Sequence, residues 1–130
     1  MKKLCGTLLC LLLTVLTAAE VYAASSVPAP VMSAAKSVVR VLAEYANGYA
    51  TGSGFVIKSN AEETLIATNY HVVEDNPYSI SVWLNENETV SASIAAYTEQ
   101  KDLCVLRLAY PVELAPLTLA SAGVKQGDAV

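Results

Sequence analysis

The sequence predicts an all-β protein built from short antiparallel strands. Six apolar blocks of strand length follow one another between residues 38 and 108, each rich in β-branched or aromatic residues and bounded by turn-forming residues. Two of these blocks alternate apolar and polar residues, which is typical of a sheet with one buried face. The chain beyond residue 36 has no convincing stretch with the 3.6-residue period of a helix. We therefore expect an antiparallel sandwich or a small barrel.

The predicted strands are separated by short connections. Asn85-Glu86-Asn87-Glu88 lies between two alternating blocks and makes a natural hairpin turn. In those two blocks the residues expected on the buried face are Ile80, Val82, Leu84, Val90, Ala92, Ile94 and Ala96. The six expected strands cover residues 38–42, 54–57, 64–68, 79–84, 89–97 and 103–108.

Residues 1–23 predict a cleaved secretory signal peptide. Lys2 and Lys3 precede an apolar run over residues 4–17, and Val21-Tyr22-Ala23 places small residues where a signal peptidase cleaves. The run is 14 residues long, whereas a membrane-spanning helix needs about 20. We therefore expect an exported protein, periplasmic or secreted, with no stable membrane anchor after cleavage.

Removal of the signal peptide changes what the composition implies. The full chain of 130 residues is 54% hydrophobic and 15% charged. The 107 residues that follow residue 23 hold 6 basic and 11 acidic residues, a net charge of −5, with no basic run. Nucleic acid is therefore not an expected partner. Cys104 is the one cysteine left, which excludes an internal disulfide and cysteine-based zinc sites, and we expect neither metal nor cofactor.

Composition divides the rest of the chain into three segments. Residues 24–36 are rich in Ala, Ser and Pro and predict a flexible leader. Residues 37–110 contain all six expected strands. Residues 111–130 begin with a proline-interrupted linker and end in a turn that enters a further strand, which is incomplete.

His71 and Asp102 could carry chemistry. His71 is the only histidine of the chain and follows the third apolar block, but a lone histidine is more often structural than catalytic. Asp102 precedes the sixth block and could simply close a turn with Gln100 and Lys101. Alternatively, Asp102 could accept the Nδ1 proton of His71 and stabilise the imidazolium formed when Nε2 takes a proton from a nucleophile.

Three motifs occur in a fixed order along the chain: Gly52-Ser53-Gly54-Phe55-Val56-Ile57, Thr68-Asn69-Tyr70-His71-Val72-Val73 and Asp102-Leu103-Cys104-Val105-Leu106. Together with the segments 116–120 and 126–130, they resemble the trypsin-like serine peptidases, in particular the bacterial HtrA/Deg-type branch. The resemblance covers residues 37–130. It implies an all-β fold, namely the first six-stranded antiparallel β-barrel of a two-barrel, chymotrypsin-fold protease, truncated before the second barrel.

The resemblance also implies a function. His71 would be the general base and Asp102 its orienting carboxylate in a serine-type endopeptidase, which hydrolyses peptide bonds of polypeptide substrates through an acyl-enzyme. The family's nucleophile is a serine in a Gly-Asn/Asp-Ser-Gly-Gly loop of the second barrel, together with the oxyanion hole and specificity pocket, and the printed sequence has no such loop. The resemblance places Ser53 in an early strand of the first barrel, where its neighbouring glycines would allow close backbone approach, so Ser53 is not the expected nucleophile. We expect a protease half-site from a truncated gene product or a split reading frame.

Other readings stay open. The chain could be a non-catalytic exported β-barrel that acts as a binding or inhibitory module. It could also be an unrelated small barrel, in which case His71 and Asp102 should lie far apart.

A first barrel alone would expose the apolar face on which its partner packs, so we expect marginal stability or self-association. Cys104 departs from the small residue usual in the family, and we expect it to be buried rather than reactive.

Overall fold

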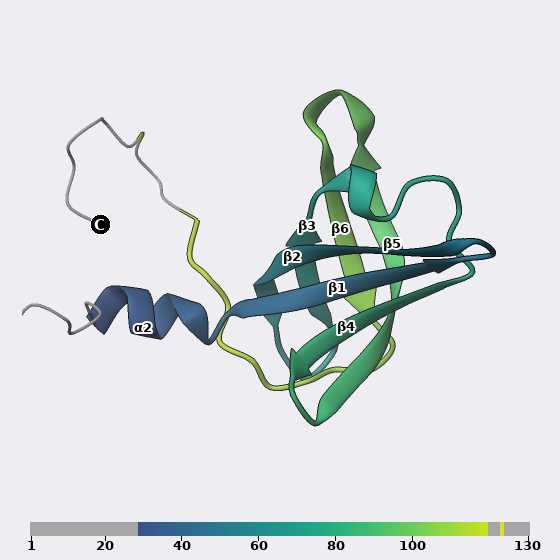
Figure 1. Ribbon diagram of the computed structural model, residues 1–130. Coiled ribbons are helices and arrows are strands. Elements are labelled where there is room, and N and C mark those ends of the chain that lie inside the picture. Colours follow the sequence, from purple (N-terminus) through teal and green to yellow (C-terminus); the bar gives the residue numbers. More distant parts are fainter. Residues whose placement is uncertain (1–28, 120–122, 124–130) are drawn as a thin grey trace, which may run out of the picture. The chain divides into compact units, whose positions relative to one another are not determined.

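Six antiparallel strands close into a barrel in the computed structural model (Figure 1), which describes residues 29–119 and residue 123. Neighbouring strands follow the order β1-β2-β3-β6-β5-β4, and β4 pairs with β1 to complete the ring. The all-β prediction is confirmed, and of the two expected architectures the barrel is the correct one. The strands are β1 (Val38–Tyr45), β2 (Gly48–Ser59), β3 (Thr64–Thr68), β4 (Ser79–Asn85), β5 (Glu88–Thr98) and β6 (Leu103–Leu108).

The observed strands agree with the expected ones at most of their ends. β3 and β6 have the predicted bounds. β2 is longer than expected, because it starts at Gly48 and its residues up to Phe55 pair with the whole length of β1, from Tyr45 opposite Gly48 to Val38 opposite Phe55. The first half of β2 is rich in Gly, Ala and Thr. Its strand conformation therefore comes from pairing with β1 rather than from an apolar pattern of its own.

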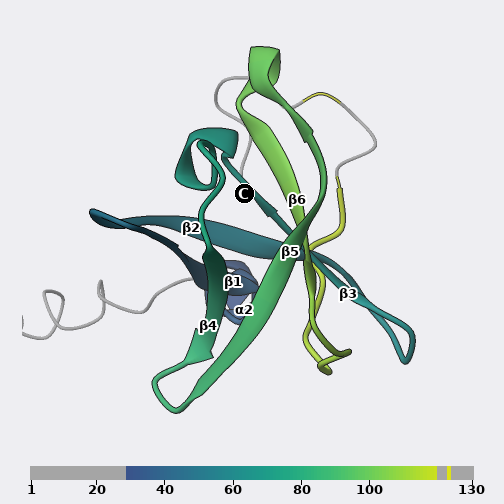
Figure 2. The same cartoon turned by 90° about the vertical axis from the view of Figure 1, so that its right-hand side faces the viewer.

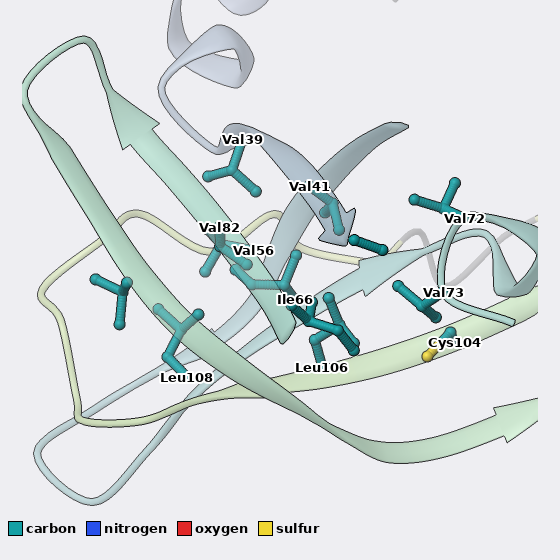
Figure 3. Close-up of a cluster of buried hydrophobic side chains, with 13 residues drawn as sticks. Val39, Val41, Val56, Ile66, Val72, Val73, Val82, Cys104, Leu106 and Leu108 are labelled. Carbon is teal, nitrogen blue, oxygen red and sulfur yellow. The ribbon is translucent and has the colours of Figure 1, made fainter. Parts of the chain in front are cut away.

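One face of each strand builds the core inside the barrel. In β6, Cys104, Leu106 and Leu108 are buried, whereas Leu103 and Arg107 are exposed. Figure 3 shows how the buried side chains from different strands meet in the interior. The fully buried residues include Val41, Val56, Ile66, Val73, Val82, Val90, Cys104 and Leu106.

The prediction for β5 is wrong at its far end. Val90 is buried as expected, but Ile94 is 38% exposed and Ala96 is exposed as well. The register of β5 against β6 shifts between Ile94 and Ala96, which is a β-bulge. The extra residue breaks the alternation, and β5 continues alongside β6 up to the pair Thr98–Leu103. Figure 2 shows this end of the two strands rising above the rest of the barrel.

The segment before the barrel, for which we expected a flexible leader, contains a short helix. The chain forms two units, Met1–Val31 and Met32–Val130, and a short helix, α2 (Ala29–Ala35), spans the boundary. Alanine and methionine favour helix, and Pro30 is tolerated because it lies in the first turn. The predicted signal peptide, 1–23, and the first part of the leader lie outside the described residues. No helix in the described part of the chain is long and apolar enough to cross a membrane.

After β6 the chain stays attached to the barrel beyond the predicted boundary at residue 110. Val112 and Leu114 pack against the core, and Leu117 donates its backbone N–H to the carbonyl of Val56 at 2.8 Å. The hydroxyls of Ser59 and Thr64 bond to the backbone of Val112. Residues 111–117, for which we expected a linker, therefore behave as a strap on the barrel. The predicted start of a further strand, at 127–130, lies outside the described residues.

Candidate active site

The pairing of β3 with β6 brings His71 and Asp102 together. Thr68, the last residue of β3, lies opposite Cys104 near the start of β6. His71 follows Thr68 in the 3-10 turn η1 (Tyr70–Val72), and Asp102 precedes β6 directly after the 3-10 turn η2 (Glu99–Lys101). Both views of the ribbon place these two turns at the same end of the barrel (Figures 1 and 2).

His71 and Asp102 are joined by two hydrogen bonds. Nδ1 of the His71 ring lies 2.7 Å from Oδ2 of Asp102, and the backbone N–H of His71 donates to Oδ1 at 2.9 Å. Because a carboxylate only accepts, Nδ1 carries the proton of the neutral ring, and Nε2 is then the basic nitrogen. The side chains are 63% and 43% exposed, respectively, so the ring is open to solvent.

Asn69 completes the hydrogen bonding of Asp102. Its Nδ2 donates to Oδ2 and to the backbone carbonyl of Asp102, each at 3.1 Å. The backbone N–H of His71, the His71 ring and, to a smaller extent, Asn69 hold the pKa of Asp102 below its usual value. The carboxylate is therefore ionised over a wider pH range. Asn69 stands inside the second motif, but the sequence alone assigned it no role because its partner is distant along the chain.

Asp102 also closes the turn that the simpler reading of the sequence suggested. Its backbone N–H bonds to the carbonyl of Glu99 at 3.0 Å, and its backbone adopts the left-handed conformation, φ 49° and ψ 47°. Asp tolerates this conformation better than most residues. The two readings of Asp102 are thus compatible, since the turn aims the carboxylate at His71.

Gly52 lies against η1, the turn that carries His71, and its lack of a side chain leaves room for that turn. A Cβ at this position would lie 2.5 Å from Cγ2 of Val72, the buried residue of η1. A Cβ at Gly54 would similarly meet Ile66 at 2.7 Å. The close approach expected of these glycines is therefore present. Ser53, between them, lies exposed on β2 and offers its backbone carbonyl to the hydroxyl of Thr68 at 2.8 Å.

Two hollows adjoin His71. One is about 630 Å³ and has Tyr45 and Tyr78 in its lining, and the other is about 420 Å³ and reaches Asp102 and Glu99. Glu74 and Asp75 line both, so the surroundings of His71 are acidic. Neither hollow of the described barrel is lined by a Ser, Thr or Cys side chain.

Cys104 is separate from these hollows. It is fully buried in β6, as expected, and burial raises the pKa of its thiol. A raised pKa keeps the thiol protonated, which makes it a poor nucleophile. Its role in the described structure is to fill the core.

A closed antiparallel barrel that presents a hydrogen-bonded histidine and aspartate at one end has the architecture of a trypsin-like peptidase barrel. Comparison with known families agrees with this class. The model of the trypsin-like peptidase domain matches residues 52–130, and the chain belongs to that family.

Similar curated proteins are serine proteases of the HtrA type. The chain is 39% identical over 57 residues to serine protease Do-like HtrA of Lactococcus lactis subsp. lactis, an alignment that covers 44% of this chain and 14% of that protein. It is 37% identical over 82 residues to serine protease HTRA1B of Danio rerio, with 62% and 16% covered. The chain therefore matches only a small part of the length of these relatives.

Solved structures of a mycobacterial protease share the fold. The active form of the Rv3671c protease from M. tuberculosis superposes with a TM-score of 0.61 at 25% identity, over 73% of this chain and 40% of that one. The inactive form gives a TM-score of 0.59 at 25% identity, over 73% and 43%. The barrel thus corresponds to less than half of each solved chain.

Proposed function

We propose that this chain supplies the general base and its orienting carboxylate to a serine-type endopeptidase, with His71 as the base and Asp102 as the orienting group. The observation that carries the proposal is the 2.7 Å hydrogen bond between Nδ1 of His71 and Oδ2 of Asp102. It favours the tautomer in which Nε2 can accept a proton. The exposure of the His71 ring leaves room for a nucleophile and a substrate.

The proposed reaction is peptide hydrolysis through an acyl-enzyme. Nε2 of His71 takes the hydroxyl proton of a serine while the serine oxygen attacks the peptide carbonyl carbon, and then returns this proton to the leaving amine. A water molecule, deprotonated by the same nitrogen, releases the acyl group and regenerates the serine. Asp102 remains ionised and stabilises the imidazolium, a role that its lowered pKa supports.

The proposed nucleophile and oxyanion-hole donors lie outside the described residues. This placement is supported by the lining of the two hollows at His71, which contains no Ser, Thr or Cys in the described barrel. The family resemblance assigns both features to a second barrel. The proposed substrates are polypeptides, as expected for relatives that are named serine proteases.

The same lining favours a second candidate function. A barrel of this family whose His71 has no nucleophile beside it could act as a non-catalytic binding or inhibitory module. The two candidates differ in one measurable respect, because only the first requires His71 to move a proton.

A chimeric protease separates the two candidates. The first barrel of Lactococcus lactis HtrA is replaced by residues 37–117 of this chain, and casein hydrolysis is measured. We expect hydrolysis that falls by at least about 10⁴-fold in both His71→Ala and Asp102→Asn. The control is Lys58→Ala, which removes an exposed ion pair with Glu63 at the β2–β3 hairpin and should leave activity unchanged.

Two outcomes contradict the proposal. If His71→Ala retains activity within a few-fold of the parent chimera, the base is assigned to the wrong residue. A chimera that folds but does not hydrolyse casein favours the non-catalytic module. The chain of 130 residues by itself is expected to show no hydrolysis above a blank.

We also propose that the protein is exported with cleavage after Ala23. The support is the arrangement of lysines, apolar run and small residues in the first 23 residues. Mass spectrometry of the protein recovered from the periplasm or medium of a bacterial host should give a chain that starts at Ala24. Recovery of an uncleaved chain from the membrane fraction would support an anchor instead.

A further inference from the structure

The hydrogen-bonded pairing of β3 with β6 ends before it reaches the proposed catalytic residues, His71 and Asp102. β3 and β6 pair as far as Thr68 and Cys104, whereas His71 and Asp102 lie beyond this point at turns of three residues each. Both side chains are substantially exposed. Exposed ion pairs contribute little by themselves, because ordering the side chains costs entropy. Besides the hydrogen bonds to Asp102, a further contact links the turn of His71 to this end of the sheet.

Two stacked tyrosines provide such a contact. The rings of Tyr70 and Tyr97 lie 4.6 Å apart with an interplanar angle of 9°. Tyr70 belongs to η1 and immediately precedes His71. Tyr97 lies near the end of β5, just before η2, and its backbone pairs with that of Cys104, which is fully buried. The stack therefore ties the turn that carries His71 to the part of the sheet from which Asp102 emerges.

The contact is made by the rings more than by the hydroxyls. The hydroxyl of Tyr70 lies 3.5 Å from Oε1 of Glu99, at the limit of a hydrogen bond. Burial, followed by the charge of Glu99, raises the pKa of Tyr70, so this hydroxyl stays protonated at neutral pH. Loss of either hydroxyl should consequently matter much less than loss of a ring.

Tyr97 is not needed to fill the core. It is 56% exposed, and its side chain lies outside the buried cluster. Tyr70 packs against that cluster and also stacks on Tyr97. A large aromatic side chain that is half exposed, and that contacts the residue next to the proposed base, is placed to orient the base rather than to stabilise the barrel.

We infer that Tyr70 and Tyr97 are positioning residues for the proposed catalytic pair, whose stacked rings hold η1 against the β5–β6 end at the spacing that joins His71 to Asp102. The inference rests on the proposed function, because positioning matters only if the pair moves a proton. The physical reason is that stacked rings add attraction beyond their buried area, and that small displacements of catalytic groups are costly to the reaction.

The test uses the single histidine of the chain as a probe. The purified full chain is labelled with ¹⁵N-histidine, and the exchange of the Nδ1 proton with water is measured by NMR at neutral pH. We expect the proton to exchange about 2- to 10-fold faster in Tyr97→Thr, the factor that an exposed aromatic pair supplies. The matched control, Tyr97→Phe, keeps the ring and should exchange like the parent, as should Tyr70→Phe.

Equal exchange in Tyr97→Thr and Tyr97→Phe overturns the inference. So does faster exchange that is accompanied by loss of amide protection in β6, because Tyr97 would then support the fold itself. Thr is chosen because it suits a strand. In the chimera, Tyr97→Thr should lower kcat without raising KM. His71→Ala in that chimera decides the proposed function, whereas proton exchange in the full chain decides the positioning role, so the two can fail separately.

Discussion

The exposed carboxylate of Asp102, which directly follows η2, joins this turn to η1. Its two oxygens accept hydrogen bonds from the backbone of His71, the ring of His71 and the amide of Asn69. The residue takes a left-handed backbone conformation to do so. These bonds all favour the ionised form, so the charge of this carboxylate is coupled to the folded state.

This coupling predicts a pH dependence of stability. Since the pKa of Asp102 is lower in the folded chain than in the unfolded one, its stabilising effect is complete well above about pH 4, the unfolded value, and is lost as the pH falls through the folded value. Urea unfolding of the parent chain and of Asp102→Asn should therefore differ at pH 7 and converge in acid. A difference that persists unchanged down to about pH 3 would contradict the assignment of the lowered pKa to this residue.

Residues of the site differ in how far the sequence reveals them. His71 and Asp102 stand in motifs whose order along the chain is informative, and the expectation that the two would meet if the family resemblance holds agrees with the structure. Asn69 and Tyr97 act through partners 33 and 27 residues away. No local pattern indicates such contacts, because the pairing depends on the register of β3, β5 and β6.

At the level of elements, the short turns were harder to predict than the strands. η1 and η2 have three residues each, too few to show a helical period. Their positions depend instead on the residues that they contact in the folded barrel. Val72 of η1 is buried over Gly52 of β2, so the turn is seated by a strand that precedes it in sequence.

Gly52→Ala should therefore disturb η1. The new Cβ would lie 2.5 Å from Cγ2 of Val72, and a β-branched side chain has little rotamer freedom with which to withdraw. We expect a loss of about 1–3 kcal/mol in the free energy of unfolding, with a shift of the His71 ring resonances. The matched control is Ser53→Ala on the same strand, where the side chain is exposed, and a change within about 0.5 kcal/mol is expected. Equal stability of the two variants would show that η1 adapts freely.

The strap after β6 depends on Thr64. This residue is fully buried, and its hydroxyl donates to the carbonyl of Val112 at 3.0 Å and accepts the backbone N–H of Val112 at 2.9 Å. Thr64→Val keeps the shape and leaves the N–H of Val112 without this acceptor, so we expect a loss of about 1–3 kcal/mol in chemical denaturation. Thr89→Val, at an exposed position of β5, should change stability by less than about 0.5 kcal/mol. Equal stability of Thr64→Val and Thr89→Val would show that the strap can detach from the barrel without a loss of stability.

At the level of the whole molecule, the barrel closes on itself, and several of its exposed apolar side chains gather around one hollow on its surface. Val38 and Leu103, 50% and 45% exposed, line a hollow of about 340 Å³ together with Phe55, Ala67 and Leu117. Apolar hollows of this kind are costly to leave in water and favour association. This surface is the one on which we expect self-association.

Sedimentation of the purified chain should reveal this association as a rise in mean mass with concentration. Val38→Lys should reduce it, because a charge would be placed in the apolar hollow. Tyr49→Lys is a suitable control, since Tyr49 is 73% exposed at the opposite end of the β1–β2 pair. A parent chain that is monomeric at all concentrations and unfolds cooperatively at high temperature would contradict the expectation.

The sequence by itself determined the all-β class, most of the strand bounds and the two candidate residues, because alternation and motif order are local properties that strand pairing preserves. Tertiary structure alone decided barrel over sandwich, the exposure of Ile94, the bulge after Ile94 that places Ala96 opposite Val105, the strap at Val112, and the contacts of Asn69 and Tyr97. The physical reason is that these features depend on the register of the strands, which no local pattern determines. Which residues meet across β3, β5 and β6 is set by the closure of the whole sheet, and no short segment contains that information.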